Sequence, residues 1–157
     1  MKVFILTDVE GVTGLVDAAQ LSSGEDAYRL VCENLMLDLN AAIEGAFEGG
    51  ATEVLAWDGH GGRNKLNFIP EMLDGRAAAV DRTHVECIGP DESFQAAFAV
   101  GYHGMAGTLN GFLDHTQSGL TIFNWYINGR RVGELVQDAL TCSAAGVPLL
   151  MVSGDEA

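Results

Sequence analysis

Apolar residues follow two spacings in the first third of the chain, and together they predict two strands joined by a helix. Residues 3–7 form a short apolar run of the kind that is buried on both faces of a parallel sheet. From about residue 25 to residue 48 an apolar residue recurs at every fourth position between charged residues, which is typical of an amphipathic helix. The recurring residues are Leu35, Leu39, Ile43 and Phe47. Residues 53–57 form a second run, so the order predicts a right-handed parallel crossover.

The middle of the chain has a less regular pattern. Residues 64–82 are mixed in character and predict a short helix and a strand around residues 77–80. Residues 94–102 are mostly apolar and predict another core strand. Residues 121–132 predict an antiparallel hairpin, because the dipeptide Asn128-Gly129 supplies the positive φ angles that a type I′ turn requires.

The last part of the chain predicts one more helix and one more strand. The helix is expected from Glu134 to Ala145 and ends before Gly146, and the core strand is expected at residues 147–152. The whole pattern predicts a single α/β domain over residues 1–157. We expect three layers: a mostly parallel sheet, flanking helices, and the hairpin as an antiparallel excursion.

Composition and charge narrow the range of partners. The chain has 48% apolar residues, enough for a real core, and 22 acidic against 8 basic residues give a formal charge of -14. This charge repels nucleic acids and anionic lipids, so neither is an expected partner. Asp8 interrupts the first apolar run too early for a secretory signal, and no run is long enough to cross a membrane, so a cytoplasmic location is predicted. The cysteines Cys32, Cys87 and Cys142 are interpreted as free buried thiols.

Candidate metal ligands follow three of the predicted strands. Asp8 and Glu10 follow the first strand, Asp58 and His60 follow the second, and His103 follows a third. Open α/β sheets place their ligand sites at the carboxyl ends of the strands. Side chains two residues apart on an extended chain share a face, so each pair can point together into a crevice. Carboxylates and imidazoles that meet there are the ligands of hydrolytic zinc sites.

Each candidate also has a purely structural interpretation. An aspartate such as Asp8 after a strand is a common turn or N-cap residue, and Glu134 at the start of a helix complements the positive helix end. His115 lies in a polar loop and could be a solvated histidine or could be oriented by its neighbour Asp114. His84 has no partner in the sequence and is interpreted as structural.

Other chemistries have little support in the sequence. The chain has no G-x-S-x-G nucleophile elbow, no phosphate-binding G-x-x-x-x-G-K-[ST] loop, and no G-x-G-x-x-G fingerprint after the first strand. The stretch from Gly59 to Gly62 resembles a phosphate-cradling loop only in its glycine content. A phosphate- or nucleotide-binding domain is therefore kept as a weaker hypothesis.

The order of the motifs resembles the D-aminopeptidase family known as peptidase family M55. The resemblance covers essentially the whole chain, and it depends on the order and spacing of six short segments. These are Asp8-Val9-Glu10-Gly11-Val12-Thr13-Gly14, Asp58-Gly59-His60, Gly101-Tyr102-His103, His115-Thr116, Ile127-Asn128-Gly129-Arg130-Arg131-Val132-Gly133-Glu134 and Ser153-Gly154-Asp155.

The resemblance implies a site for two zinc ions per chain. Asp8 would bridge the two ions, Glu10 and His60 would complete one site, and His103 and Glu134 would complete the other. The resemblance thus implies that Glu134 is a metal ligand rather than a carboxylate that only complements the positive helix end. The implied reaction is hydrolysis of short peptides, with N-terminal D-amino acids, by a water that the two metals activate.

Two further residues receive roles next to the metals. His115 matches the histidine proposed as catalytic in the family, and Asp58 is expected to orient an imidazole ligand. The family also implies a small peptide as substrate and a homo-oligomer as the assembly. Family members continue beyond the Ser153-Gly154-Asp155 segment into a C-terminal region that this chain lacks. The alternative hypothesis is therefore a module that binds metal but is catalytically inactive.

Overall fold

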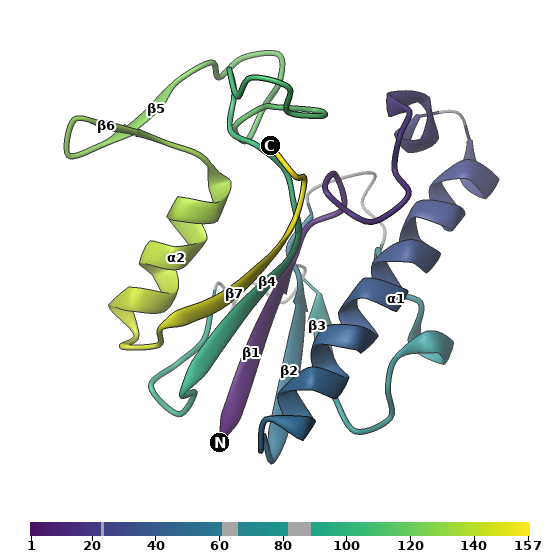
Figure 1. Ribbon diagram of the computed structural model, residues 1–157, viewed down its shortest axis with the longest axis vertical. Coiled ribbons are helices and arrows are strands. Elements are labelled where there is room, and N and C mark those ends of the chain that lie inside the picture. The colour runs from purple at the N-terminus through teal and green to yellow at the C-terminus, as the bar shows by residue number, and fades with distance from the viewer. Residues whose placement is uncertain (23, 61–65, 82–88) are drawn as a thin grey trace.

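The computed structural model of the chain describes residues 1–22, 24–60, 66–81 and 89–157 (Figure 1). A five-stranded parallel sheet with the strand order β3-β2-β1-β4-β7 forms its centre, and β5 and β6 form a separate antiparallel pair. The strands are β1 (Lys2–Thr7), β2 (Glu53–Asp58), β3 (Ala78–Asp81), β4 (Ala96–Tyr102), β5 (Trp125–Ile127), β6 (Arg130–Val132) and β7 (Leu149–Gly154). The predicted α/β class with a mostly parallel sheet and a hairpin excursion is confirmed.

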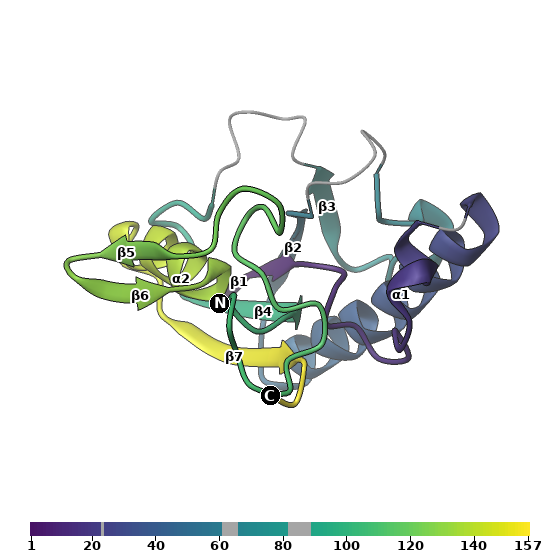
Figure 2. The same ribbon diagram turned by 90° about the horizontal axis from the view of Figure 1, so that it is seen from above.

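Two α-helices cover opposite faces of the sheet, which gives the predicted three layers (Figures 1 and 2). They are α1 (Glu25–Glu48) and α2 (Glu134–Ala144), and short 3-10 helices lie at η1 (Ala18–Leu21) and η2 (Pro70–Met72). No helix formed by the described residues is long and apolar enough to cross a membrane.

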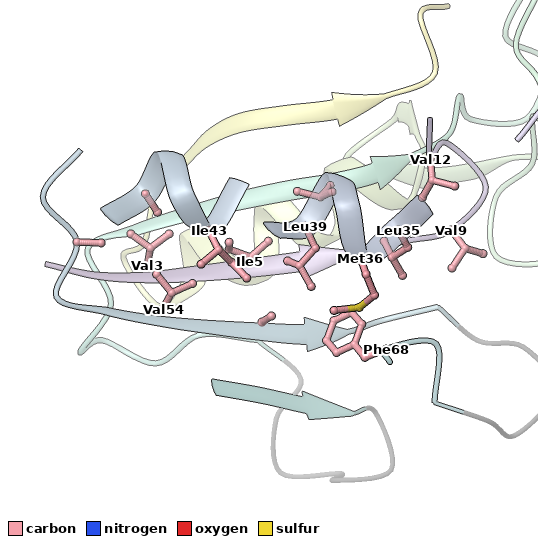
Figure 3. Close-up of a cluster of buried hydrophobic side chains, with 14 of the residues drawn as sticks. Val3, Ile5, Val9, Val12, Leu35, Met36, Leu39, Ile43, Val54 and Phe68 are labelled. Carbon is pink, nitrogen blue, oxygen red and sulfur yellow. The ribbon is translucent and has the colours of Figure 1, made fainter. Parts of the chain in front are cut away.

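The central strand β1 is buried on both faces, as its continuous apolar run predicts. Val3 and Ile5 point toward α1 and pack with its apolar stripe (Figure 3). Phe4 and Leu6 point the other way, into the second cluster beneath α2. The buried members of the α1 stripe are Tyr28, Val31, Cys32, Leu35, Met36, Leu39, Ile43 and Ala46. Burial on both faces of β1 therefore fixes where the chain emerges at the carboxyl edge of the sheet.

The hairpin forms where the turn residues predict it. Asn128 and Gly129 have φ angles of 50° and 78°, as a type I′ turn requires. The hairpin lies on the α2 side of the molecule, away from α1 (Figure 2). It leads through Val132 directly into α2, so it determines where that helix begins.

The prediction of a last core strand is wrong in one respect. β7 begins and ends two residues later than predicted and is an edge strand, with Leu150 65% and Val152 49% exposed. β7 pairs with β4 alone. An apolar run does not reveal whether a strand has one neighbour or two, because both positions favour the same β-branched and aliphatic residues.

Glycines let the chain segments that follow β1 and β4 approach very closely. The Gly11 N–H donates to the Gly101 carbonyl at 2.8 Å, and the Asp8 N–H donates to Val100 at 2.9 Å. A Cβ atom on Gly11 would lie 2.0 Å from the Tyr102 carbonyl oxygen. Gly101 has a φ angle of 78°, which side chains other than glycine rarely adopt. This backbone contact holds Asp8 and Glu10 beside the end of β4.

We predict that Gly11→Ala destabilises the fold by about 1–3 kcal/mol or more, because the added methyl group clashes with backbone atoms, which cannot move away as a side chain can. Gly45→Ala is the matched control. Gly45 lies in α1, and an added Cβ there meets no atom within 4 Å. The free energy of unfolding of this variant should therefore increase by up to about 1 kcal/mol, because alanine has the higher helix propensity. Urea unfolding of the two variants measures both effects, and equal stability of the two would contradict the close approach.

Candidate metal centre

Six potential metal ligands from separate parts of the chain meet at the carboxyl edge of the sheet. Asp8 and Glu10 follow β1, His60 follows β2, His103 follows β4, His115 lies in the loop after β4, and Glu134 opens α2. The structure thus brings together all five residues expected to bind metal and the expected catalytic histidine. Asp8, Glu10 and His103 are buried, and the other three are partly buried.

Asp8 lies between two histidines from different strands. Its Oδ1 is 3.0 Å from His60 Nδ1, and its Oδ2 is 3.4 Å from His103 Nε2. Glu10 Oε2 lies on the His60 side, 2.8 Å from the same Nδ1 atom. One carboxylate therefore faces two separate groups of donors.

Glu134 and His115 complete the second group. Glu134 Oε1 is 3.3 Å from His103 Nε2 and 3.6 Å from His115 Nε2, and it accepts a hydrogen bond from the Gln117 N–H at 2.7 Å. The rings of His103 and His115 stack with centroids 4.0 Å apart and planes 4° apart. The Glu134 carboxylate therefore points into the site and is tied there by the loop after β4.

Backbone carbonyl groups orient two of the imidazole rings. His103 Nδ1 lies 2.9 Å from the Gly104 oxygen, and His115 Nδ1 lies 2.8 Å from the Leu113 oxygen. Each Nδ1 must carry its proton to donate to a carbonyl oxygen, so Nε2 is the atom that each neutral ring presents to the carboxylates. This is the usual outer support of a metal-binding histidine.

The carboxylates and imidazoles perturb one another strongly. Burial raises the pKa of Asp8 to about 6, while burial of Glu10 is outweighed by hydrogen bonds with His60 and Asp8, which lower its pKa to about 2. Burial also disfavours the charged forms of His60 and His103, but their carboxylate neighbours raise the pKa of His60 to about 10 and that of His103 to about 9. Without metal, protons on these rings balance the buried negative charge.

The donor set fits metal ions. Two groups of three side chains place one ligand atom each within 4.8 Å of the others: Asp8, Glu10 and His103, and His103, His115 and Glu134. Glu10 Oε2 lies 2.8 Å from His60 Nδ1 and His103 Nε2 lies 3.3 Å from Glu134 Oε1, but among the described residues neither buried atom has a partner at a good hydrogen-bond angle. Buried polar atoms without partners are rare and are explained here if a cation binds them.

The expected contact of Asp58 with a histidine is wrong, and the alternative in which Asp114 orients His115 is not what the structure shows. Asp58 accepts hydrogen bonds from the backbone and side-chain nitrogens of Asn67 at 2.6 and 2.8 Å, and among the described residues it makes none to a histidine ring. Asp114 accepts from the Gly107 N–H at 2.6 Å, so a carbonyl group and not this carboxylate orients His115. Neighbours in sequence were poor guides because side chains at loop positions turn toward whichever backbone N–H groups lack partners.

His84, Cys87 and Gly61-Gly62 of the glycine-rich stretch lie outside the described residues. Cys32 and Cys142 are buried, as predicted, and neither is part of a disulfide in the described part of the chain.

The residues that form the rest of the cavity were not predicted as part of the site. A cavity of about 260 Å³ opens beside the donors, and its further lining comes from Thr7, Trp57, Gly59, Tyr102, Gln117 and Asp138. Asp138 could have been found from its spacing, because it follows Glu134 by one helical turn and shares its face. Asn67 had no such signal, since it lies in the mixed segment after β2.

The fold and the donor set define the class of the protein: an α/β protein with a candidate metal centre of the kind that hydrolytic enzymes use. The chain belongs to the D-aminopeptidase family, peptidase family M55, whose model matches residues 1–157.

Two comparisons agree with this assignment. The chain is 34% identical over 159 residues to a D-aminopeptidase of Bacillus subtilis (strain 168), covering 99% of this chain and 57% of the relative. It superposes with a TM-score of 0.88 and 33% identity on a solved Bacillus subtilis structure, the Zn-dependent D-aminopeptidase DppA, described as a self-compartmentalizing protease. That superposition also covers 99% of this chain and 57% of the solved chain. The chain thus spans little more than half the length of the relatives it matches.

We predict that zinc binding at pH 7 releases about two protons per chain, one each from His60 and His103. Their pKa values of about 10 and about 9 lie above neutrality, whereas a ligand nitrogen must be unprotonated. Because both pKa values are raised, the release should decrease as the pH increases toward 10, and zinc affinity should increase over the same range. Calorimetric titration in two buffers of different ionisation enthalpy counts the protons. Binding without proton release at pH 7 would contradict protonated His60 and His103 rings in the metal-free site.

Proposed function

We propose that this chain is a zinc-dependent aminopeptidase that hydrolyses short peptides, with N-terminal D-amino acids as the preferred class. Its family and its zinc-dependent relative support a peptide hydrolase that uses zinc. The observation that carries the two-metal form is Asp8, whose two carboxylate oxygens face histidines from two different strands. A carboxylate in that position can bridge two ions.

We assign the ligands in two groups around that bridge. Glu10 and His60 form one group, and His103 and Glu134 form the other. Their distances support this division, because Glu10 lies beside His60 whereas Glu134 lies beside His103. When bound, zinc would supply Lewis acidity toward the peptide carbonyl group and lower the pKa of the attacking water.

The proposed role of His115 is proton transfer. Its Nδ1 is held by the Leu113 carbonyl group, so its Nε2 is free to take a proton at the cavity, where it lies 4.0 Å from Glu10 and 3.6 Å from Glu134. In this position it can accept a proton from the attacking water and return it to the amine that leaves. Its stacking on His103 fixes the ring relative to the ligands.

The oligomeric state of this chain is also a proposal, and two alternative functions stand beside the aminopeptidase. The solved relative is described as self-compartmentalizing, which supports a homo-oligomer for this chain as well. The alternative function is a metal-binding module without activity; the chain spans 57% of the length of the relatives it matches. The phosphate-binding hypothesis loses support, because the Gly59 N–H already donates to the Thr7 carbonyl at 3.2 Å.

The purified chain loaded with zinc should hydrolyse D-alanyl dipeptides and lose this activity when a chelator removes the metal. Release of free alanine measures the rate, and L-alanyl dipeptides test the stereochemical preference. Two bound zinc ions without turnover would support the inactive module, and turnover that a chelator leaves unchanged would contradict the metal-dependent function.

Asp8→Ala should reduce zinc content more than any other single ligand substitution, because a bridging carboxylate serves both ions and screens their repulsion. His115→Ala should keep its zinc but lose about 10²-fold or more in rate, the range of a general acid–base group. Elemental analysis of the dialysed proteins measures the metal, with Asp26→Ala in the first turn of α1 as a control. Full zinc content in Asp8→Ala would refute the bridge, and zinc loss in His115→Ala would make His115 a ligand.

A further inference from the structure

The residues that line the cavity beside the metal centre are of two chemical kinds. Asp8, Glu10, His60, His115 and Glu134 belong to the candidate ligand set, and the remaining lining residues are Thr7, Trp57, Gly59, Tyr102, Gln117 and Asp138. Among these remaining described residues, Asp138 is the one carboxylate. None of the described residues that line the cavity is a lysine or an arginine.

Asp138 is fixed in place by a hydrogen bond that leaves most of its carboxylate available. The Tyr102 hydroxyl donates to Asp138 Oδ2, and Tyr102 lies on β4 beside the ligand His103. Thr7 is engaged elsewhere, since its hydroxyl donates to the Trp57 carbonyl at 3.1 Å. No hydrogen bond within the described part of the chain reaches Asp138 Oδ1. This oxygen can accept from a ligand in the cavity.

Within the described part of the chain, no positive group balances the charge of Asp138. Asp138 follows Glu134 by one helical turn, an arrangement of like charges that destabilises a helix. Burial, together with the charges of Glu134 and Asp8, raises the pKa of Asp138 to about 6. A partly buried carboxylate beside other carboxylates is costly unless a cation joins it.

We propose that Asp138 binds the α-ammonium group of the substrate's N-terminal residue, and this inference rests on the aminopeptidase function proposed above. A free N-terminus is a cation with three N–H donors, which matches an acceptor that is held by Tyr102 and has no cationic partner among the described residues. The ammonium group would then lie against Asp138 while the scissile carbonyl group reaches the candidate metal ligands. Asp138 is in this view a specificity-determining residue that selects for peptides with a free amino end.

The cavity chemistry favours this ligand over the other end of a peptide. A C-terminal carboxylate would meet four carboxylates, those of Asp8, Glu10, Glu134 and Asp138, with no lysine or arginine among the described lining residues. An amino group bound by Asp138 also leaves both donor groups free for the water and the carbonyl oxygen.

The test compares two ligands that differ only in the amino group. Calorimetry on the zinc-loaded protein gives the affinities of alanine, in both enantiomers, and of propionate. In the wild type, alanine should bind more tightly. Asp138→Asn keeps an acceptor for the Tyr102 hydroxyl but removes the charge, so it should weaken alanine binding about tenfold or more, a change of about 1.4 kcal/mol. Propionate binding should stay the same or become tighter.

Controls separate this role from a structural one and from the proposed function. Zinc content of Asp138→Asn should equal that of the wild type, and Glu44→Gln, an exposed carboxylate on α1, should change neither affinity. If Asp138→Asn does not fold, Asp138→Ala should show the same selective loss. Equal weakening of both ligands, or no change in either, would overturn the role of Asp138. Absence of peptide hydrolysis by the wild type would instead refute the aminopeptidase function, because the binding comparison does not depend on turnover.

Discussion

Repulsion between carboxylates at the carboxyl edge of the sheet is the constraint around which this molecule is built. Asp8, Glu10, Glu134 and Asp138 line one cavity, and the carboxylates raise the pKa of His60 to about 10 and that of His103 to about 9. Such a cluster is costly to assemble, because each carboxylate loses water and gains like-charged neighbours. Cations offset this cost, so the same feature that opposes folding provides affinity for metal ions and for a cationic ligand.

The apolar layers supply the rigidity that this cluster needs. β1 is buried against both helices, and its end is hydrogen-bonded to the turn after β4 through Gly11 and Gly101. Because this contact is between backbone atoms, it cannot relax as side chains can, and it fixes the spacing of the ligands that follow β1 and β4. Glu134 is positioned differently, by the hairpin that leads into α2 and by the Gln117 N–H. A strand end and a helix start thus meet at one site although they are far apart in the chain.

Much of the fold could be predicted from the sequence because the responsible interactions are local or periodic. The stripe of α1 and the turn at Asn128-Gly129 follow directly from residue spacing and backbone preference. The edge position of β7 could not be predicted, since it depends on which strands pair. At the site, the residues that follow strands were predicted from the topology of α/β sheets, and the role of Glu134 needed the family resemblance. Contacts such as Asp58 with Asn67 depend on loop paths that no periodicity encodes.

The place of Asp138 outside the candidate ligand set also bears on the direction in which a peptide would enter. Metal ions would neutralise Asp8, Glu10 and Glu134, but they would leave Asp138 as an anionic group in the same cavity. A peptide entering with its amino end first brings a positive charge to that group, whereas one entering with its carboxyl end brings a second negative charge into a partly buried space. Water screens charges poorly at the short distances inside such a cavity. The difference in electrostatic energy between the two peptide ends therefore outweighs contacts that are the same for either direction of entry. An exopeptidase acting at the amino end is therefore the activity that the charges of this site favour.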